Sequence, residues 1–346
     1  MKKIEQKDLF ELKNVGQPVV AGDAFFFTET KMNEKKNTYE TAIYKYTADG
    51  NVAYGDEGTV NSSLKVSPDG KWISFISNAG EEKTPQLKIQ SVQGGKAIAL
   101  TEEKKGVSSY VWAKDSKSIV FQTTKPEEEE KKEEFPQPIV VEKTTYRFDG
   151  GTFLPNDEVT QIKKVDVATK EVTTLFESKE SFGLRDVLHN GTTLVVDRDL
   201  SNVRWTLDSA EACYVDVATG DIHPILEAGT DESYRYVLDA KDGAVLQYSS
   251  GKHGFVTQAD LIVNFDSKPD AEGHILNLTA DLDVEWGDWL VADFQQAVTG
   301  VEPQWFDEES FLACASVEGR TVLYRLYLDG RVEKIFDELL HLTGAT

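Results

Sequence analysis

The stretch Val66–Phe75 reads Val-Ser-Pro-Asp-Gly-Lys-Trp-Ile-Ser-Phe, a polar turn followed by apolar residues of the kind that form a strand. Trp112–Phe121 repeats its form, and looser copies lie at Asp239–Leu246, His189–Val196 and Trp305–Leu312. An Asp, Asn or Gly turn that feeds β-branched and aromatic residues at alternate positions is typical of a β-hairpin. The chain therefore repeats one kind of hairpin several times.

A second phrase follows each copy of the first. Tyr214–Ile222 nearly repeats Lys164–Val172, and Leu326–Val332 and Tyr44–Val52 have the same form. Each of these segments again places a turn between two alternating stretches, as a second hairpin requires. Two hairpins per repeat predict four antiparallel strands.

The spacing of the turns identifies the architecture. The first-hairpin turns are centred near Gly22, Gly70, Ser116, Gly191, Gly243 and Glu309. The second-hairpin turns are centred near Gly50, Gly95, Lys170, Gly220, Gly273 and Gly330. Most successive turns in each series are about 45 to 55 residues apart, and a four-stranded unit of about that length is a propeller blade. The sequence predicts an all-β fold, a β-propeller with six visible blades of four antiparallel strands.

We expect residues 1–346 to form a single propeller domain, since a propeller counts as one domain despite its length. The predicted blades span approximately residues 9–56, 60–105, 106–179, 182–227, 228–279 and 280–336.

Two spacings between turns exceed the common interval, one within the third blade and one between Gly243 and Glu309. Both turn series are lengthened in the third blade, which places an insertion between its two hairpins. Residues 125–138 of this insertion are acidic and bounded by prolines, a composition that predicts a solvated loop, with an acidic recognition segment as the alternative. The alternating aromatic and apolar residues of Asp281–Asp293 predict an additional strand in the fifth or sixth blade.

Composition argues against several classes of partner. The formal charge is −23 with a pI near 4.6, whereas nucleic acids and anionic membranes are bound mainly by Lys and Arg. Cys213 and Cys314 lie in different repeats without metal-ligand spacing, so they predict neither a disulfide framework nor a zinc site. The first residues lack the apolar run of a signal peptide, and no run of 18 apolar residues occurs, so we expect a cytoplasmic protein.

Motifs that carry chemistry do not occur in the sequence. The string closest to a Gly-x-Ser-x-Gly nucleophile elbow is Gly106–Tyr110, which ends in Tyr at the start of a blade. The five histidines are scattered over different repeats, and Asp197–Asp199 and Asp281–Asp283 lack the remaining ligands of a calcium loop. We therefore predict no catalytic, cofactor-binding or metal-binding residue and no cofactor.

Four segments resemble one family. The phrase Ser67–Phe75 is common to propellers of the prolyl oligopeptidase and TolB types. Val140–Leu154, directly after the insertion, is similar to the Tyr-Arg-x-Asp-Gly-x-Gly-aromatic-Leu segment of the acylaminoacyl-peptidase branch of prolyl oligopeptidases. Leu278–Asp283 with Asp293, and Pro303–Asp307, resemble further segments of that branch. The resemblance extends from about residue 10 to residue 336.

This resemblance implies a serine peptidase whose amino-terminal propeller, usually seven-bladed, caps a carboxy-terminal α/β-hydrolase domain that bears the Ser, Asp and His triad. In that family the propeller admits short peptides and excludes folded proteins. The sequence contains neither the hydrolase domain nor a seventh blade, so the resemblance predicts a truncated form that is not catalytic by itself. No catalytic residue can be carried over.

The resemblance also implies partners. We expect the hydrolase domain of the same parent protein and short peptide substrates. Because each blade covers the faces of its neighbours, a ring that lacks one blade exposes two apolar faces; we expect it to close with six blades or to self-associate. Whether Arg147, Arg198, Arg204 or Arg235 binds a peptide carboxylate or forms a surface ion pair is left open.

Two other functions remain open. The first is a stand-alone TolB-like or WD-repeat-like interaction propeller, although the chain lacks a signal peptide and the Gly-His and Trp-Asp pairs of WD repeats. The second is a propeller glycosidase or metal enzyme, which would need carboxylates clustered around the central channel.

Overall fold

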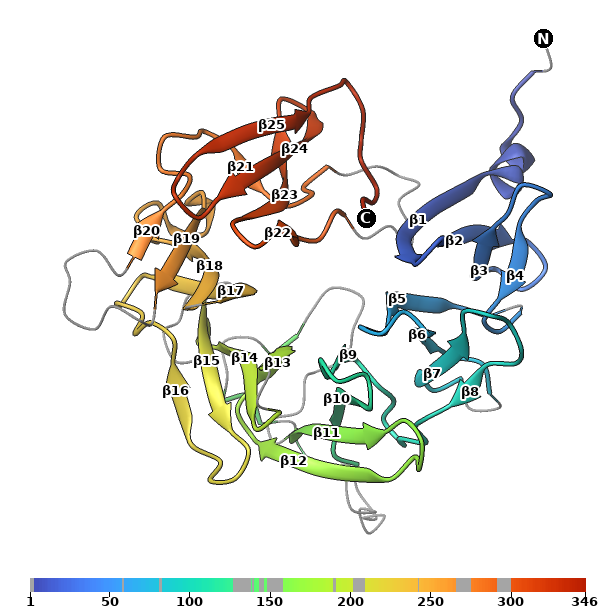
Figure 1. Ribbon diagram of the computed structural model, residues 1–346, viewed down its shortest axis with the longest axis horizontal. Coiled ribbons are helices and arrows are strands. Elements are labelled where there is room, and N and C mark those ends of the chain that lie inside the picture. Colours follow the sequence, from blue (N-terminus) through green and yellow to red (C-terminus); the bar gives the residue numbers. More distant parts are fainter. Residues whose placement is uncertain are drawn as a thin grey trace.

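Six antiparallel sheets surround a central axis in the computed structural model (Figure 1). The residues that the structure describes are 3–57, 59–80, 83–126, 138, 140–142, 146–147, 158–188, 191–201, 209–241, 243–265, 275–290 and 300–346. The six-bladed propeller predicted from the hairpin repeats is confirmed.

The first three sheets are meanders of consecutive strands. The first contains β1 (Lys13–Ala21), β2 (Ala24–Asn33), β3 (Thr38–Tyr46) and β4 (Val52–Tyr54). The second contains β5 (Asn61–Val66), β6 (Trp72–Ser77), β7 (Gln86–Ser91) and β8 (Ile98–Ala99). The third contains β9 (Ser109–Trp112), β10 (Ser118–Thr124), β11 (Thr160–Asp166) and β12 (Val172–Ser178). The chain between β10 and β11 is the predicted insertion, and residues 127–137 of it lie outside the described residues.

The fourth and fifth sheets follow the same order. The fourth contains β13 (Phe182–Val187), β14 (Thr193–Asp199), β15 (Ala210–Asp216) and β16 (Ile222–Pro224). The fifth contains β17 (Ser233–Ala240), β18 (Gly243–Ser249), β19 (Asp260–Phe265) and β20 (Ile275–Asn277).

The sixth sheet has an inner strand in two pieces, β21 (Glu285–Trp286) and β22 (Gln304–Asp307). Both pair with β23 (Ser310–Val317), which is followed by β24 (Arg320–Tyr327) and β25 (Val332–Phe336). The additional strand predicted within Asp281–Asp293 is therefore β21, and it belongs to the sixth blade.

Among the described elements, two short 3-10 helices lie outside the sheets: η1 (Gln6–Glu11) and η2 (Gly254–Val256). No helix among the described residues has the length and apolar character needed to cross a membrane.

The repeated sequence phrases form the turns that were predicted from them. In the second blade Gly70 has φ near +70° and donates from its backbone N–H to the Ser67 carbonyl over 2.8 Å. The Ser67 hydroxyl donates to Asp69 over 2.7 Å, and this bond is the main cause that lowers the pKa of the Asp69 carboxyl. Ser116 of the next blade accepts a hydrogen bond from the Asp69 N–H over 2.9 Å, so neighbouring turns are linked.

In the second repeated phrase, Lys164–Val172 and Tyr214–Ile222, one aspartate stabilises the turn. Asp166 accepts backbone hydrogen bonds from Ala168 and Thr169 over 2.9 and 2.8 Å, and Asp216 accepts the equivalent bonds in the fourth sheet. An aspartate that bonds to the backbone two and three residues ahead stabilises a tight turn. Gly273, predicted at the centre of another such turn, lies outside the described residues.

Each internal sheet is apolar on both faces, since consecutive residues of its central strands enter different cores. Ile119 and Phe121 of β10 pack in the core shared with the second sheet, while Val120 packs in the core shared with the fourth. Val195 similarly faces the fifth sheet, whereas its neighbours Leu194 and Val196 face the third. Five such cores join successive sheets from the first to the sixth.

The last residues of the chain lie between the sixth sheet and β1 (Figure 1). We call residues 341–346 the carboxyl-terminal segment. Leu342 and Ala345 pack against a small buried cluster of the sixth sheet, and the Thr343 hydroxyl donates to the Val15 carbonyl of β1 over 3.2 Å. Gln304 of β22 donates to the Ala345 carbonyl over 3.3 Å. The segment therefore contacts the first and last blades at once.

The face of the first sheet that points away from the second remains partly open. Val15, Val20, Phe25 and Tyr46 are exposed by 52%, 48%, 37% and 60%. Each sheet is built from its own consecutive strands, so within the described residues no strand from one end of the chain completes the sheet at the other. Self-association through these faces stays a prediction.

The inter-blade cores set the stability of the ring. Phe121 is fully buried between the second and third sheets, so Phe121→Ala is expected to lower the free energy of unfolding by about 3–5 kcal/mol. Val172→Ala on β12, where the side chain is 40% exposed, is the control and should change it by less than about 0.5 kcal/mol. Urea unfolding measures both, and equal effects would show that the inter-blade cores are not well packed.

The carboxyl-terminal segment covers Cys314. A Cβ on Gly344 would lie 2.2 Å from Cδ of Pro18, so Gly344→Ala is expected to push the segment off β1 and open the cluster around Cys314. Burial raises the pKa of Cys314 to about 11 and that of Cys213 to about 12, so both thiols should react slowly with Ellman's reagent in the parent protein. The variant should gain one fast-reacting thiol, and Thr346→Ala should gain none.

Cys213 is the internal reference for this experiment, because it is buried between the third and fourth sheets, far along the chain from the altered contact. Replacing each cysteine in turn assigns the fast phase. If the Gly344→Ala protein labels at the parental rate, the carboxyl-terminal segment does not protect Cys314.

Candidate functional site: the central channel

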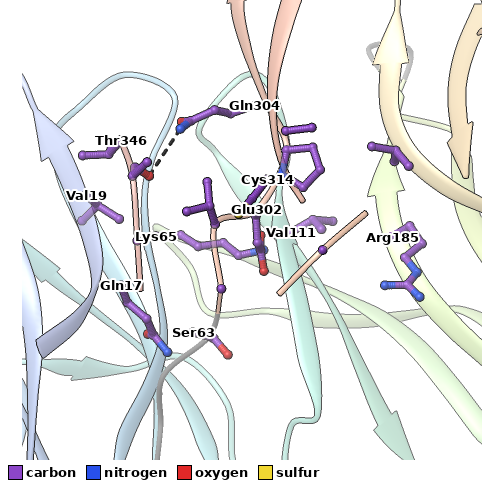
Figure 2. Close-up of a pocket in the computed structure, with 18 of the residues that line it drawn as sticks. Gln17, Val19, Ser63, Lys65, Val111, Arg185, Glu302, Gln304, Cys314 and Thr346 are labelled. Atoms are coloured by element: carbon purple, nitrogen blue, oxygen red, sulfur yellow. Dashed lines mark hydrogen bonds between the residues drawn. The ribbon is translucent and has the colours of Figure 1, made fainter. Parts of the chain in front are cut away.

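A cavity of about 770 Å³ lies where the inner strands of all six sheets meet (Figure 2). Its wall includes residues of β1, β5, β9, β13 and β17, together with the chain that leads into β22. Residues 344–346 complete the wall between the sixth sheet and the first. A concave site of this volume is large enough for a short peptide or a small molecule.

Irregular inner strands shape the wall. The pairing of the inner strand with its neighbour shifts register at Gly16/Val19 in β1, Ser62/Lys65 in β5, Leu184/Asp186 in β13 and Tyr236/Leu238 in β17. A β-bulge redirects side chains and is common at the rims of barrels and near active sites. The residues within these shifts, among them Gln17, Ser63, Arg185 and Val237, line the cavity.

Three of these bulges, in β5, β13 and β17, are held by hydrogen bonds from the preceding blade. Gln17 accepts from the Leu64 N–H over 3.0 Å, and Gln122 accepts from the Leu184 N–H over 2.7 Å. Asp197 accepts a hydrogen bond from the Tyr236 N–H over 2.9 Å. We call these the cross-blade hydrogen bonds. A bulge leaves backbone groups without a partner in the sheet, so a side chain of the adjacent blade supplies it.

A buried carboxylate lies behind one part of the wall. Asp197 of β14 is 5% exposed, and its second oxygen accepts from Nε of Arg185 over 2.6 Å. Burial raises the pKa of Asp197, while the nearby cations of Arg185 and Arg235 oppose that rise. Two arginines thus flank a single buried carboxylate.

Arg185 keeps donor capacity toward the cavity. Its hydrogen bond to Asp197 uses Nε, and within the described part of the chain the two terminal amino groups have no hydrogen-bond partner. The side chain is 43% exposed, and Figure 2 shows it on the side of the cavity opposite Gln17, Val19 and Thr346.

A second cation projects from β5. Nζ of Lys65 donates to the Tyr110 carbonyl over 3.0 Å and lies 5.2 Å from the centre of the Tyr110 ring. Among the described lining residues the charged side chains are Lys65, Arg185, Arg235 and Glu302. Three of these four side chains are cations, and the terminal carboxylate of Thr346 and the Asp197 carboxylate behind the wall lie beside them.

The segment nearest to a nucleophile elbow has a structural role. Ser109 and Tyr110 lie on β9, where the Tyr110 hydroxyl shares a hydrogen bond of 2.9 Å with Ser74 and also donates to the Ser63 carbonyl. Complete burial raises the pKa of Tyr110, so its hydroxyl stays protonated and ties β9 to the second sheet.

Of the four arginines named in the sequence analysis, only one is a described lining residue of the cavity. Arg235 lines the cavity, whereas Arg198 pairs with Glu180 over 3.4 Å and Arg147 is exposed. Arg204 lies outside the described residues. Arg185 and Lys65 also line the cavity, but nothing in the sequence indicates this, because neither a motif nor the regular alternation of a strand marks a residue within or beside a bulge.

The histidines of the described chain form no cluster. Nε2 of His341 lies 2.6 Å from Asp288, while His223 and His253 lie outside the cavity wall, and His189 and His274 are not described. No group of three or more potential metal ligands occurs among the described residues. Glu302 is the single carboxylate side chain among the lining residues that are described.

No protein-family model matches the chain. The uncharacterized peptidase YuxL of Bacillus subtilis is 28% identical over 212 residues, which cover 58% of this chain and 32% of that protein. The acylaminoacyl peptidase of Pyrococcus horikoshii matches in structure with a TM-score of 0.69 and 20% identity over 95% of this chain and 46% of that one.

The β-propeller domain of the Trilobed protease from Pyrococcus furiosus, described as having an open velcro topology, matches with a TM-score of 0.60 and 18% identity. That match covers 94% of this chain and 86% of the other. The chain thus spans about a third of the curated relative and about half of the acylaminoacyl peptidase.

The Arg185–Asp197 pair gives the channel wall a defined pH response. Arg185→Met leaves a buried carboxylate with less compensation and is expected to lower the free energy of unfolding by about 1–3 kcal/mol at neutral pH. Because the pKa of Asp197 is raised in the folded protein, and rises further in the variant, the loss should shrink as the pH falls and the carboxyl takes up a proton.

Arg331→Met is the matched control, since Arg331 pairs with Asp329 at the surface, where the two side chains are 64% and 57% exposed. Its stability should follow the parent protein at every pH. Urea unfolding between pH 4 and pH 8 measures the difference, and a deficit of the Arg185 variant that grows on acidification would contradict the assignment.

Proposed function

Because the chain is a six-bladed propeller of the kind carried by acylaminoacyl peptidases and prolyl oligopeptidases, we propose that it is the substrate-gating domain of a serine oligopeptidase. The partner is an α/β-hydrolase domain that belongs to the same parent protein and supplies the nucleophile, the base and the oxyanion donors. The substrates are short peptides. The sequence likeness to a curated peptidase supports this proposal.

The single observation that carries the proposal is the central channel. Most of its wall is built from the inner strands, and the cross-blade hydrogen bonds fix three of these, β5, β13 and β17. Residues 300–303 and 344–346 complete the wall between the sixth sheet and the first. A channel of this size admits an extended peptide and excludes a folded protein on steric grounds.

The described channel residues are suited to passage rather than to bond cleavage. The thiol of Cys314 is the strongest potential nucleophile in the wall, and burial raises its pKa to about 11, which keeps it protonated at neutral pH. The Tyr110 hydroxyl is occupied by hydrogen bonds between blades. The chemistry therefore belongs to the partner domain.

Activity assays test whether catalysis requires the hydrolase domain. The chain alone should not hydrolyse acyl-amino-acid or dipeptide chromogenic substrates, whereas a protein that includes the downstream reading frame should do so and should be inhibited by a serine-directed reagent. A downstream frame without a Gly-x-Ser-x-Gly segment would overturn the proposal.

A variant tests the gate itself in the longer protein. Val237→Trp adds bulk to the bulge of β17 and should lower kcat/KM for peptides of ten residues by about tenfold or more while leaving dipeptide substrates nearly unchanged. Val172→Trp, at an exposed site on the outer strand β12, is the control. Equal effects of Val237→Trp on long and short substrates would show that peptides do not pass through the channel.

A further inference from the structure

We infer that Gln17 and Ser63 form a site in the channel wall that binds the backbone of an extended peptide, through the N–H and C=O of one of its residues. The inference rests on the proposed role of the channel as a peptide passage, but its test needs no peptidase activity. Both residues line the cavity, on the neighbouring inner strands β1 and β5 (Figure 2). The site consists of neutral groups, so it does not depend on the charge of the wall.

The backbone conformation of both residues is unusual. Gln17 has φ near +48° and Ser63 has φ near +55°, values in the left-handed region that favours glycine. The other non-glycine residues of the described chain with positive φ lie between strands, whereas Gln17 and Ser63 lie within strands, at the bulges of β1 and β5. Strained residues of this kind cluster at active sites and ligand sites. Glycine would adopt both positions more easily, so the side chains found there call for a reason.

The Gln17 amide has one group in use and one available. Its oxygen accepts from the Leu64 N–H over 3.0 Å, and because that N–H can only donate, the positions of the amide oxygen and nitrogen are fixed. Nε2, which carries two donor hydrogens, has no hydrogen-bond partner among the described residues. The half-buried Gln17 side chain therefore offers a donor at the cavity wall.

The Ser63 hydroxyl is available as well, since it forms no hydrogen bond within the described part of the chain. The backbone on either side of it is held: the Ser63 carbonyl accepts from the buried Tyr110 hydroxyl, and the next N–H, that of Leu64, donates to Gln17. These two bonds fix the bulge and place Ser63 beside the Gln17 amide. A hydroxyl both donates and accepts hydrogen bonds.

Together the two side chains match the backbone of one extended residue. In an extended chain the N–H and C=O of a residue point to the same side, as in the hydrogen-bonded pairs of an antiparallel sheet. Nε2 of Gln17 donates to the C=O, and the Ser63 hydroxyl accepts from the N–H. Main-chain hydrogen bonds give a peptide affinity without reading its side chains. The ligand is therefore a short extended peptide of any sequence, for which a cavity of about 770 Å³ has room.

Two uncharged probes test the site in a binding experiment on this chain. One is acetyl-Ala-Ala-Ala amide, and the other is its analogue with esters in place of the internal amides, which has the same length but lacks the internal N–H groups. Saturation-transfer NMR and calorimetry measure the binding. The amide peptide should bind about fivefold more tightly than the ester, the effect of one net hydrogen bond.

Three variants address the two side chains. Ser63→Gly removes the hydroxyl and supplies the residue that adopts positive φ without strain, so it should unfold at or above the parental temperature and yet lose the preference for the amide peptide. Ser63→Ala removes the hydroxyl alone and should lose the same preference. Gln17→Glu keeps an oxygen for the Leu64 N–H but removes the Nε2 donor, and should weaken binding of the amide peptide by about fivefold.

Lys170→Gly is the matched control. Lys170 has φ near +62° in an exposed turn outside the cavity wall, so glycine relieves the same backbone strain there without touching the channel. This variant should keep the parental preference for the amide peptide.

Equal binding of the two probes by the parent chain, binding of neither, or a parental preference in the Ser63→Gly protein would overturn the inference. A Ser63→Gly protein that unfolds below the parental temperature would also contradict it, since the hydroxyl would then serve the fold. None of these results touches the peptidase proposal, which fails on a downstream frame without a Gly-x-Ser-x-Gly segment, and that failure would leave this binding test valid.

Discussion

The structure depends on the packing of each sheet against its two neighbours. The central strands of the third, fourth and fifth sheets send consecutive side chains to opposite cores, as Ile119, Val120 and Phe121 do. A sheet that is apolar on both faces cannot be covered by solvent on either side. The blades must therefore stand face to face, and a ring is the arrangement that provides every internal sheet with two neighbours.

The ring places the six inner strands around one axis, and this position conflicts with regular pairing. Five of the inner strands, β1, β5, β13, β17 and β22, shift register against their neighbours, and a bulge leaves backbone groups without a partner in the sheet. Side chains of the preceding blade replace some of these partners. The side-chain oxygens of Gln17, Gln122 and Asp197 accept hydrogen bonds from backbone N–H groups of the next inner strand. The same contacts thus join the blades and fix the channel wall.

Asp197 connects stability with the proposed function. Its cross-blade bond holds the bulge of β17, and its other oxygen holds Arg185 in the wall of β13. The nearby cations of Arg185 and Arg235 compensate this buried carboxylate. The proposed gate for short peptides therefore depends on the inner strands that surround the channel and on the side chains that fix their bulges.

The sequence by itself determined the hairpin turns, the number of sheets and the place of the third-blade insertion. These features are local: Asp69, Gly70 and Asp166 form hydrogen bonds with residues two or three positions away, so their pattern is visible in the chain.

Only the tertiary structure decided which side chains line the channel. The face of a sheet on which a side chain lies is predicted from the alternation of apolar and polar residues along the strand. The bulges at Ser63 and Arg185 interrupt this alternation. The partners that fix them, Gln17 for Leu64 and Gln122 for Leu184, lie in another blade, 47 and 62 positions away in the chain. The carboxyl-terminal segment reaches β1 over a still longer separation, because folding into a ring brings the last blade beside the first.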